Sequence, residues 1–263
     1  MDMGIKGRVA CVAGASKGLG RAVAWGLAAE GCDLALCARN GAALEGLAAE
    51  IAKTHGVRVL SRALDLSQAG AGQAFCLEAA QNLGRLDILV TNAGGPPAGG
   101  FADFGEEDWL TAVRLTLFSA QELARGALPA MLEQGWGRIV NLTSVSVKQP
   151  LSGLILSNSI RAAVIGWAKT LADEVGKAGV TVNSICQGWI LTERVEELLA
   201  HRSQTQGISR EEALKQAVAG IPLGRIGRPE EMADLAVFLA SERASYITGA
   251  SYLIDGGLYR GLM

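Results

Sequence analysis

The chain has 263 residues, of which 49% are hydrophobic and 19% charged, and its net charge at pH 7 is -2. This composition is typical of a well-buried core and excludes a disordered or fibrous protein. The small net charge gives no reason to expect nucleic-acid or membrane partners. No apolar run approaches the length of a membrane span, and the N-terminus lacks a signal-peptide pattern, so we expect a cytoplasmic protein.

Apolar, strand-like runs alternate along the chain with segments of helical periodicity. The expected strands are residues 8–13, 33–38, 58–63, 86–91, 138–143, 181–185 and 251–254, and the expected helices include residues 21–30, 41–54, 109–134 and 160–177. This alternation predicts a parallel sheet covered by helices on both faces. The predicted fold class is therefore a Rossmann-type doubly wound α/β fold with about seven strands. We expect one domain over residues 1–263, with a dinucleotide-binding half (1–135) and a substrate-pocket half (136–263).

A glycine-rich turn follows the first expected strand and leads directly into a helix. Its glycines let the backbone approach a pyrophosphate, and the free N–H groups of the helix start attract the anion. The spacing is GxxxGxG, and such a turn can also serve only to pack a helix on a strand. Its place at the first strand–helix junction favours dinucleotide binding by Gly14, Ser16, Lys17, Gly18, Leu19 and Gly20.

The second expected strand ends in Arg39 and Asn40, without the acidic residue that would bind a ribose 2′-hydroxyl. Arg39 could instead neutralise a 2′-phosphate, with Lys17 contributing from the glycine-rich turn. Both could also be solvated surface charges. Two basic side chains at these two positions predict NADP(H) as the cofactor in preference to NAD(H).

Further motifs follow the later strands: Asp65-Leu66, Asn92-Ala93-Gly94, and a closing stretch over residues 221–231 and 255–257. Together with the glycine-rich turn, they resemble the short-chain dehydrogenase/reductase family, of the 3-oxoacyl-(acyl carrier protein) reductase-like kind, over nearly the whole chain. The resemblance implies an oxidoreductase that assembles as a homotetramer or homodimer. It also implies cofactor contacts from Asp65, Leu66, Asn92, Ala93, Gly94, Arg161, Gly188, Ile190 and Thr192.

The resemblance implies a catalytic tyrosine, a lysine four residues later, a serine on the preceding strand and an asparagine on the central helix. Ser144 matches the serine, but Ser157 and Arg161 stand at the tyrosine and lysine positions, and Thr116 at the asparagine position. An aliphatic hydroxyl is far less acidic than a phenol, and a guanidinium keeps its proton. We therefore take Ser144, Ser157 and Arg161 as candidate catalytic residues with an atypical proton relay. Serines near Ser157 could instead cap the helix.

Three hypotheses remain open from the sequence. The first, which we favour, is an NADP(H)-dependent oxidoreductase acting on a small-molecule carbonyl or hydroxyl compound, an acyl thioester among the candidates. The second is an isomerase, lyase or acyl-transfer enzyme, because Lys148 follows Ser144 by four residues, although Lys148 could be an exposed loop lysine. The third is a non-catalytic NADP(H)-binding sensor. Residues 192–217 predict a helical lid over the cleft, and no metal site is expected.

Overall fold

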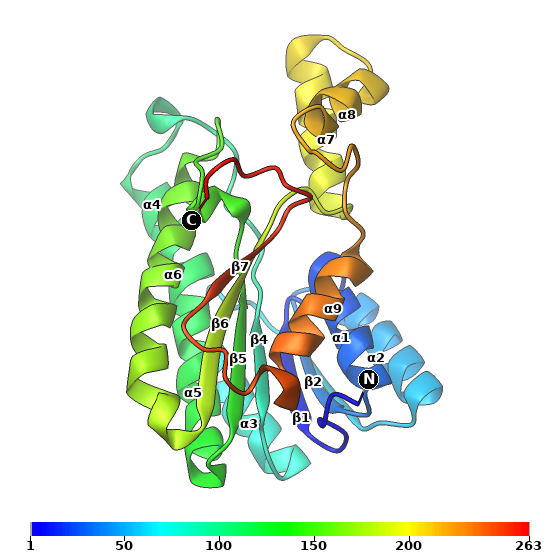
Figure 1. The fold of residues 1–263 in the computed structure, drawn as a ribbon, viewed down its shortest axis with the longest axis vertical. Helices are drawn as coiled ribbons and strands as arrows, with labels where there is room; N and C mark the ends of the chain where they lie inside the picture. The colour runs from blue at the N-terminus through cyan, green and yellow to red at the C-terminus, as the bar shows by residue number, and fades with distance from the viewer. Residues whose placement is uncertain (1, 263) are drawn as a thin grey trace.

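A seven-stranded parallel sheet forms the centre of the computed structural model, which describes residues 2–262 (Figure 1). The strand order is β3-β2-β1-β4-β5-β6-β7. The strands are β1 (Val9–Ala13), β2 (Asp33–Ala38), β3 (Val59–Ala63), β4 (Ile88–Thr91), β5 (Gly137–Leu142), β6 (Val180–Gln187) and β7 (Ser251–Ile254). Strands β1, β4 and β5 are buried along their whole length, as expected for a sheet covered on both faces. The predicted doubly wound α/β class is confirmed.

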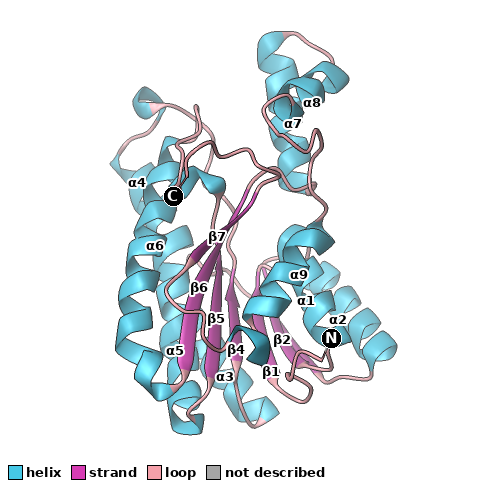
Figure 2. Cartoon of the chain, in the orientation of Figure 1, coloured by secondary structure: helices cyan, strands magenta, loops and turns pink. Residues whose placement is uncertain are grey.

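Helices cover both faces of the sheet (Figure 2). One face carries α1 (Gly18–Ala29), α2 (Gly41–His55) and α9 (Pro229–Leu239). The other carries α3 (Ala71–Leu83), α5 (Ser119–Gln134) and α6 (Ile155–Val175). Each helix buries an apolar stripe of period 3.6 against the strands, as Leu44, Leu47 and Ile51 do in α2. Two apolar layers therefore hold the sheet.

The winding of the chain reverses at β1, which pairs with β2 on one side and with β4 on the other. Val12 lies opposite Leu36 and Val90 in this register, so the three strands end at the same edge of the sheet. Ligands of doubly wound sheets bind in the crevice at this switch point, outside the carboxyl ends of the strands. The fold thus brings the loops after β1, β2 and β4 together.

Three helix boundaries differ from the sequence prediction. The helix expected at 109–134 is divided into α4 (Glu106–Val113), a π-helical turn (Arg114–Phe118) and α5, and the Ser119 hydroxyl donates to the Leu115 carbonyl in that turn. Helix α6 begins at Ile155, five residues before the expected start, because the buried Leu156 and Ile160 extend its apolar stripe. Helix α1 begins within the glycine-rich turn, where helix propensity gives no signal.

Helices α7 (Glu193–Gln206) and α8 (Arg210–Val218) stand above the carboxyl ends of the strands (Figure 1); we call them the lid. A small apolar cluster of Val195, Leu199, Ala213 and Ala217 joins them, and Arg210 pairs with Glu196. Within residues 2–262, no helix combines the length and apolar character that crossing a membrane requires. The 3-10 turns are Phe101–Asp103, Val145–Val147, Gly176–Ala178 and Glu242–Ala244.

Candidate active site

A cavity of about 810 Å³ opens at the carboxyl edge of the sheet and is lined by residues from both halves of the chain. All but one of the residues that the sequence predicted for cofactor binding or catalysis line it. They are Gly14, Ser16, Lys17, Gly18, Leu19, Arg39, Asn40, Asp65, Leu66, Asn92, Ala93, Gly94, Ser144, Ser157, Arg161, Gly188, Ile190 and Thr192. Gly20 does not line the cavity, because it is buried beneath the glycine-rich turn.

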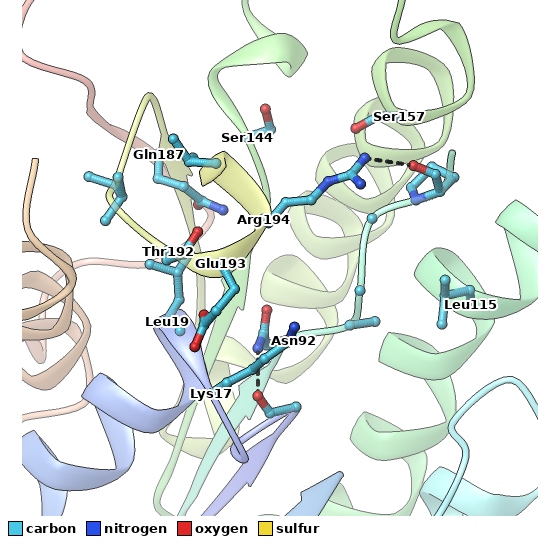
Figure 3. Close-up of a pocket in the computed structure, with 18 of the residues that line it drawn as sticks. Lys17, Leu19, Asn92, Leu115, Ser144, Ser157, Gln187, Thr192, Glu193 and Arg194 are labelled. Carbon is cyan, nitrogen blue, oxygen red and sulfur yellow. Dashed lines mark hydrogen bonds between the residues drawn. The ribbon is translucent and has the colours of Figure 1, made fainter. Parts of the chain in front are cut away.

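The glycine-rich turn, which we call the glycine cradle, packs too closely against the start of α1 for side chains at its inner positions. A Cβ atom on Gly20 would lie 2.4 Å from the Gly14 carbonyl oxygen, and Gly14 itself has a φ of +61° that favours glycine. Asn92 donates from Nδ2 to the carbonyls of Ala13 (3.2 Å) and Gly14 (3.3 Å), which ties the end of β4 to this turn (Figure 3). No side chain caps the N-terminus of α1. Its first N–H groups are therefore available to an anion in the cavity.

The rim after β2 and β3 carries Arg39 and Asp65. Arg39 is exposed, and its guanidinium would lie 4.0 Å from a Cβ atom on Gly94 across the cavity mouth. Asp65 accepts hydrogen bonds from the Ser67 backbone N–H (2.9 Å) and hydroxyl (2.8 Å), which lower the pKa of its carboxyl. Asn40 accepts from the Ala43 N–H at 3.1 Å and so caps α2. Its side chain has a structural role, which the sequence did not predict.

Two serine hydroxyls mark the other end of the cavity (Figure 3). Ser144 follows β5, and its oxygen accepts from the Ser146 N–H at 3.1 Å. Ser157 lies in the first turn of α6, whose N-terminal residue Leu154 makes no side-chain cap. The Arg161 Nε donates to the Ser157 oxygen at 3.2 Å. Both hydroxyl oxygens thus accept a hydrogen bond from the protein, and their protons remain free to be donated to a ligand.

Arg161 is a fixed cation at this end of the cavity. Its Nη1 donates to the carbonyls of Leu142 (3.2 Å) and Thr143 (3.0 Å), at the end of β5. Burial, and secondarily the charge of Arg194, lowers the pKa of Arg161 to about 10. Within residues 2–262, no carboxylate forms a salt bridge with Arg161. Because its pKa is about 10, the guanidinium keeps its proton at neutral pH. No carboxylate of the described chain balances its positive charge.

Among the lining residues that the sequence did not predict for the site, Gln187 and Arg194 make polar contacts within it. Gln187 donates from Nε2 to the Thr143 carbonyl at 2.7 Å, and its Oε1 is buried without a partner in the described chain. Arg194 extends from the lid and donates from Nη2 to the Pro96 carbonyl at 3.2 Å, across the cavity (Figure 3). Spacing gives no signal for such contacts, because they depend on how the loops after β4 and β6 fold.

The remaining candidates do not converge on the cavity. Lys148 is exposed and is absent from the lining, so the serine–lysine arrangement is not formed. Thr116 is buried in the π-helical turn, where its hydroxyl has no partner among residues 2–262 and faces a separate, much smaller cavity that Arg161 also lines. The described part of the chain contains no cluster of three or more His, Cys, Asp or Glu that could hold a metal ion.

A cavity at the switch point, with a glycine cradle and an open helix N-terminus, defines a dinucleotide-binding protein of the Rossmann class. A family model described as enoyl-(acyl carrier protein) reductase matches residues 14–259. The D-beta-hydroxybutyrate dehydrogenase of Cupriavidus necator is 35% identical over 261 residues, covering 96% of this chain and 98% of that protein. The chain belongs to the short-chain dehydrogenase/reductase family.

Other relatives agree with this assignment. The 3-oxoacyl-(acyl-carrier-protein) reductase of Pseudomonas aeruginosa is 34% identical over 258 residues, covering 98% of this chain and 99% of that protein. Among solved structures, L-sorbose reductase from Gluconobacter frateurii, complexed with NADPH and L-sorbose, matches with a TM-score of 0.95. It is 36% identical, and the match covers 100% of both chains.

Proposed function

We propose that the protein is an NADPH-dependent reductase of a small carbonyl compound. The observation that carries the proposal is a single cavity that joins the glycine cradle, Arg39 and the two hydroxyls beside Arg161. The solved L-sorbose reductase that resembles the chain over its full length is a complex with NADPH. NADPH, when bound, would supply a hydride to the substrate.

The lining residues fit the chemistry of this cofactor. Gly14 and Gly18 line the cavity at the start of α1, where a pyrophosphate would lie, and Gly20 lets the helix pack closely on the turn. Arg39 and Lys17 would hold the 2′-phosphate, and the remaining contacts would come from the loops after β3, β4 and β6. Arg161 would hold ribose hydroxyls, while Ile190 and Thr192 would position the nicotinamide amide.

Ser144, Ser157 and Arg161 would stabilise the charge that develops on the substrate oxygen. The two hydroxyls can donate hydrogen bonds into the cavity, and the nearby guanidinium favours negative charge there. Arg161 does not release its proton at neutral pH, because its pKa is about 10. The proton taken up by the product oxygen would therefore come from water, passed through a serine hydroxyl. The family's tyrosine is not needed in this scheme.

A second candidate substrate is a carbon–carbon double bond conjugated to a carbonyl. In this reaction the carbonyl oxygen carries enolate charge without taking up a proton, because the proton from water ends on the carbon next to the carbonyl. A cation that holds its own proton suits such an oxygen. The description of the matching family model, an enoyl reductase, points the same way. The exposed position of Lys148 gives no support to acyl transfer.

Consumption of NADPH with matched substrates tests the proposal. A 3-oxoacyl thioester, the corresponding 2-enoyl thioester and a simple ketone would be supplied at equal concentrations, with NADPH binding measured by calorimetry. Turnover of the ketone or the 3-oxoacyl compound supports carbonyl reduction, and turnover of the enoyl compound alone supports the second candidate. NADPH binding without turnover of these compounds, or of 2-oxo and 3-oxo acids, contradicts both and favours the non-catalytic sensor.

Replacing Arg39 by serine should weaken NADPH binding about tenfold or more while leaving NADH binding unchanged. The reason is that the exposed guanidinium would pair with the 2′-phosphate, which NADH lacks. Calorimetric titration with both cofactors measures this effect. Arg21→Ser removes another exposed arginine, in α1, that does not line the cavity, and it should change neither affinity. An equal loss for NADPH and NADH in Arg39→Ser would contradict the assignment.

A further inference from the structure

Two guanidinium groups flank one point at the substrate end of the cavity. A Cβ atom built on Gly95 would lie 3.8 Å from Arg194 Nε and 3.9 Å from Arg194 Nη2, and also 3.9 Å from Arg161 Nη2. The Arg161 side chain comes from α6, and the Arg194 side chain comes from the lid. The two cations therefore approach the same point from two different elements of the fold.

Neither cation is neutralised by the protein at this point. Within residues 2–262, no carboxylate pairs with Arg161, and its Nη2 donates to no protein acceptor. Arg194 has an ion pair with Glu197 at 3.5 Å, but both side chains are exposed there, so the pair contributes little. The Arg161 charge is buried and therefore less screened by water than that of Arg194, so an anion between the two groups would relieve their repulsion.

The direction of Arg194 also favours a ligand. A lid arginine could extend into water, where its charge is best solvated. Instead Arg194 Nη2 donates to the Pro96 carbonyl at 3.2 Å, which holds the guanidinium over the cavity (Figure 3). This contact uses one donor, and the guanidinium fork keeps further N–H groups that can bind two oxygens of a carboxylate or a phosphate.

The anion that fits is a part of the substrate. The cofactor phosphates would be held by the glycine cradle, Lys17 and Arg39, whereas the arginine pair lies beside Ser157, to which Arg161 donates. We infer that Arg194 and Arg161 bind an oxyanion, a carboxylate or a phosphate, carried by the substrate near its reducible carbonyl. This inference rests on the proposed reductase function and names its substrate class as acidic carbonyl compounds.

Matched pairs of charged and neutral substrates test the inference. The pairs are 2-oxo and 3-oxo acids with their methyl esters, and dihydroxyacetone phosphate with dihydroxyacetone, which distinguishes the two sources of the oxyanion. We expect the wild-type kcat/KM to favour one charged series by about tenfold or more. Arg194→Met should abolish the preference, and Arg194→Lys should keep part of it. Lys215→Met, an exposed lid residue away from the cavity, should keep it fully.

Two results would overturn the inference. They are equal use of charged and neutral partners by the wild type, and an unchanged preference in Arg194→Met. If Arg194→Met keeps the preference and also loses NADPH affinity, Arg194 acts on the cofactor phosphates.

If no compound turns over, the reductase proposal fails separately. Calorimetry then tests the anion site. The NADP⁺ complex is titrated with 2- and 3-hydroxy acids, with glycerol phosphate and with their neutral counterparts. Binding of a charged member alone, lost in Arg194→Met, supports the site, and any other binding result overturns it.

Discussion

Replacing Arg161 by methionine should lower kcat for substrate reduction by about a hundredfold or more, in a protein that still folds. The substitution removes the cation beside the reacting oxygen and the Nε–H donor that orients the Ser157 hydroxyl. The structural cost is small, because two effects oppose each other. The carbonyls of Leu142 and Thr143 lose a donor, but Thr143 still accepts from Gln187, and a dehydrated charge disappears. We expect the free energy of unfolding to change by less than about 2 kcal/mol.

Steady-state kinetics and denaturant unfolding measure the two parts of this prediction. Arg161→Lys keeps the charge, but a compact ammonium cannot bridge Ser157 and both carbonyls, so its kcat should be intermediate. The pKa of Arg161 lies near 10, lowered by burial from its ordinary value. Activity that depends on this cation should therefore fall as pH rises through about 10. Full activity of Arg161→Met would contradict a role for the guanidinium.

The folded protein's stability should respond to pH with the opposite sign. A cation whose pKa is lowered on folding binds its proton more weakly in the folded state than in the unfolded state. The contribution of Arg161 to stability therefore increases as pH rises through about 10. Unfolding in denaturant at a series of pH values should show this increase in the free energy of unfolding for the wild type and not for Arg161→Met.

Replacing Gly20 by alanine should abolish measurable NADPH binding and destabilise the fold by about 2 kcal/mol or more. The new Cβ would lie 2.4 Å from the Gly14 carbonyl oxygen and 2.8 Å from its carbon. These are backbone atoms of the cradle, so relief requires moving the start of α1 away from the turn. Such a shift displaces the N–H groups that would hold the pyrophosphate.

Gly46 provides a matched control for this substitution. It lies inside α2, and a Cβ there would meet no atom within 4 Å. Gly46→Ala should leave NADPH affinity unchanged and stabilise the protein by about 0.5–1 kcal/mol, because alanine restricts the unfolded chain. Calorimetry and thermal unfolding compare the two variants. Wild-type affinity in Gly20→Ala would show that the turn does not hold the cofactor.

The sheet was predictable because its strands are continuous apolar runs, as in Val9–Ala13 and Ile88–Thr91, separated by helical periodicity. Helix ends were less predictable. The π-helical turn at Arg114–Phe118 leaves the hydrophobic pattern almost unchanged, so periodicity predicts one long helix there. The start of α6 depends on tertiary burial of Leu156, which local propensity does not contain.

The candidate site was partly predictable for a topological reason. Parallel strands end at one edge, so motifs placed after β1, β2, β4 and β5 had to meet there. Strand order does not determine the direction of side chains in the loops. Asn40 turns back to cap α2, and Arg194 reaches across from the lid to Pro96. The Arg194 contact joins segments 98 residues apart in the sequence, so local patterns do not contain it. The Asn40 cap is local, and an asparagine directly before a helix is a signal for such a cap.

The most direct test of the account is transfer of hydride from the cofactor to a substrate. The protein would be given NADPH deuterated on the transferable carbon of the nicotinamide ring, together with the carbonyl and enoyl compounds named above. Mass spectrometry of the products then reports where the label lies. We predict one deuterium in the product of the wild type and much slower labelling with Arg161→Met. Absence of label from every compound, with the cofactor bound, would contradict it.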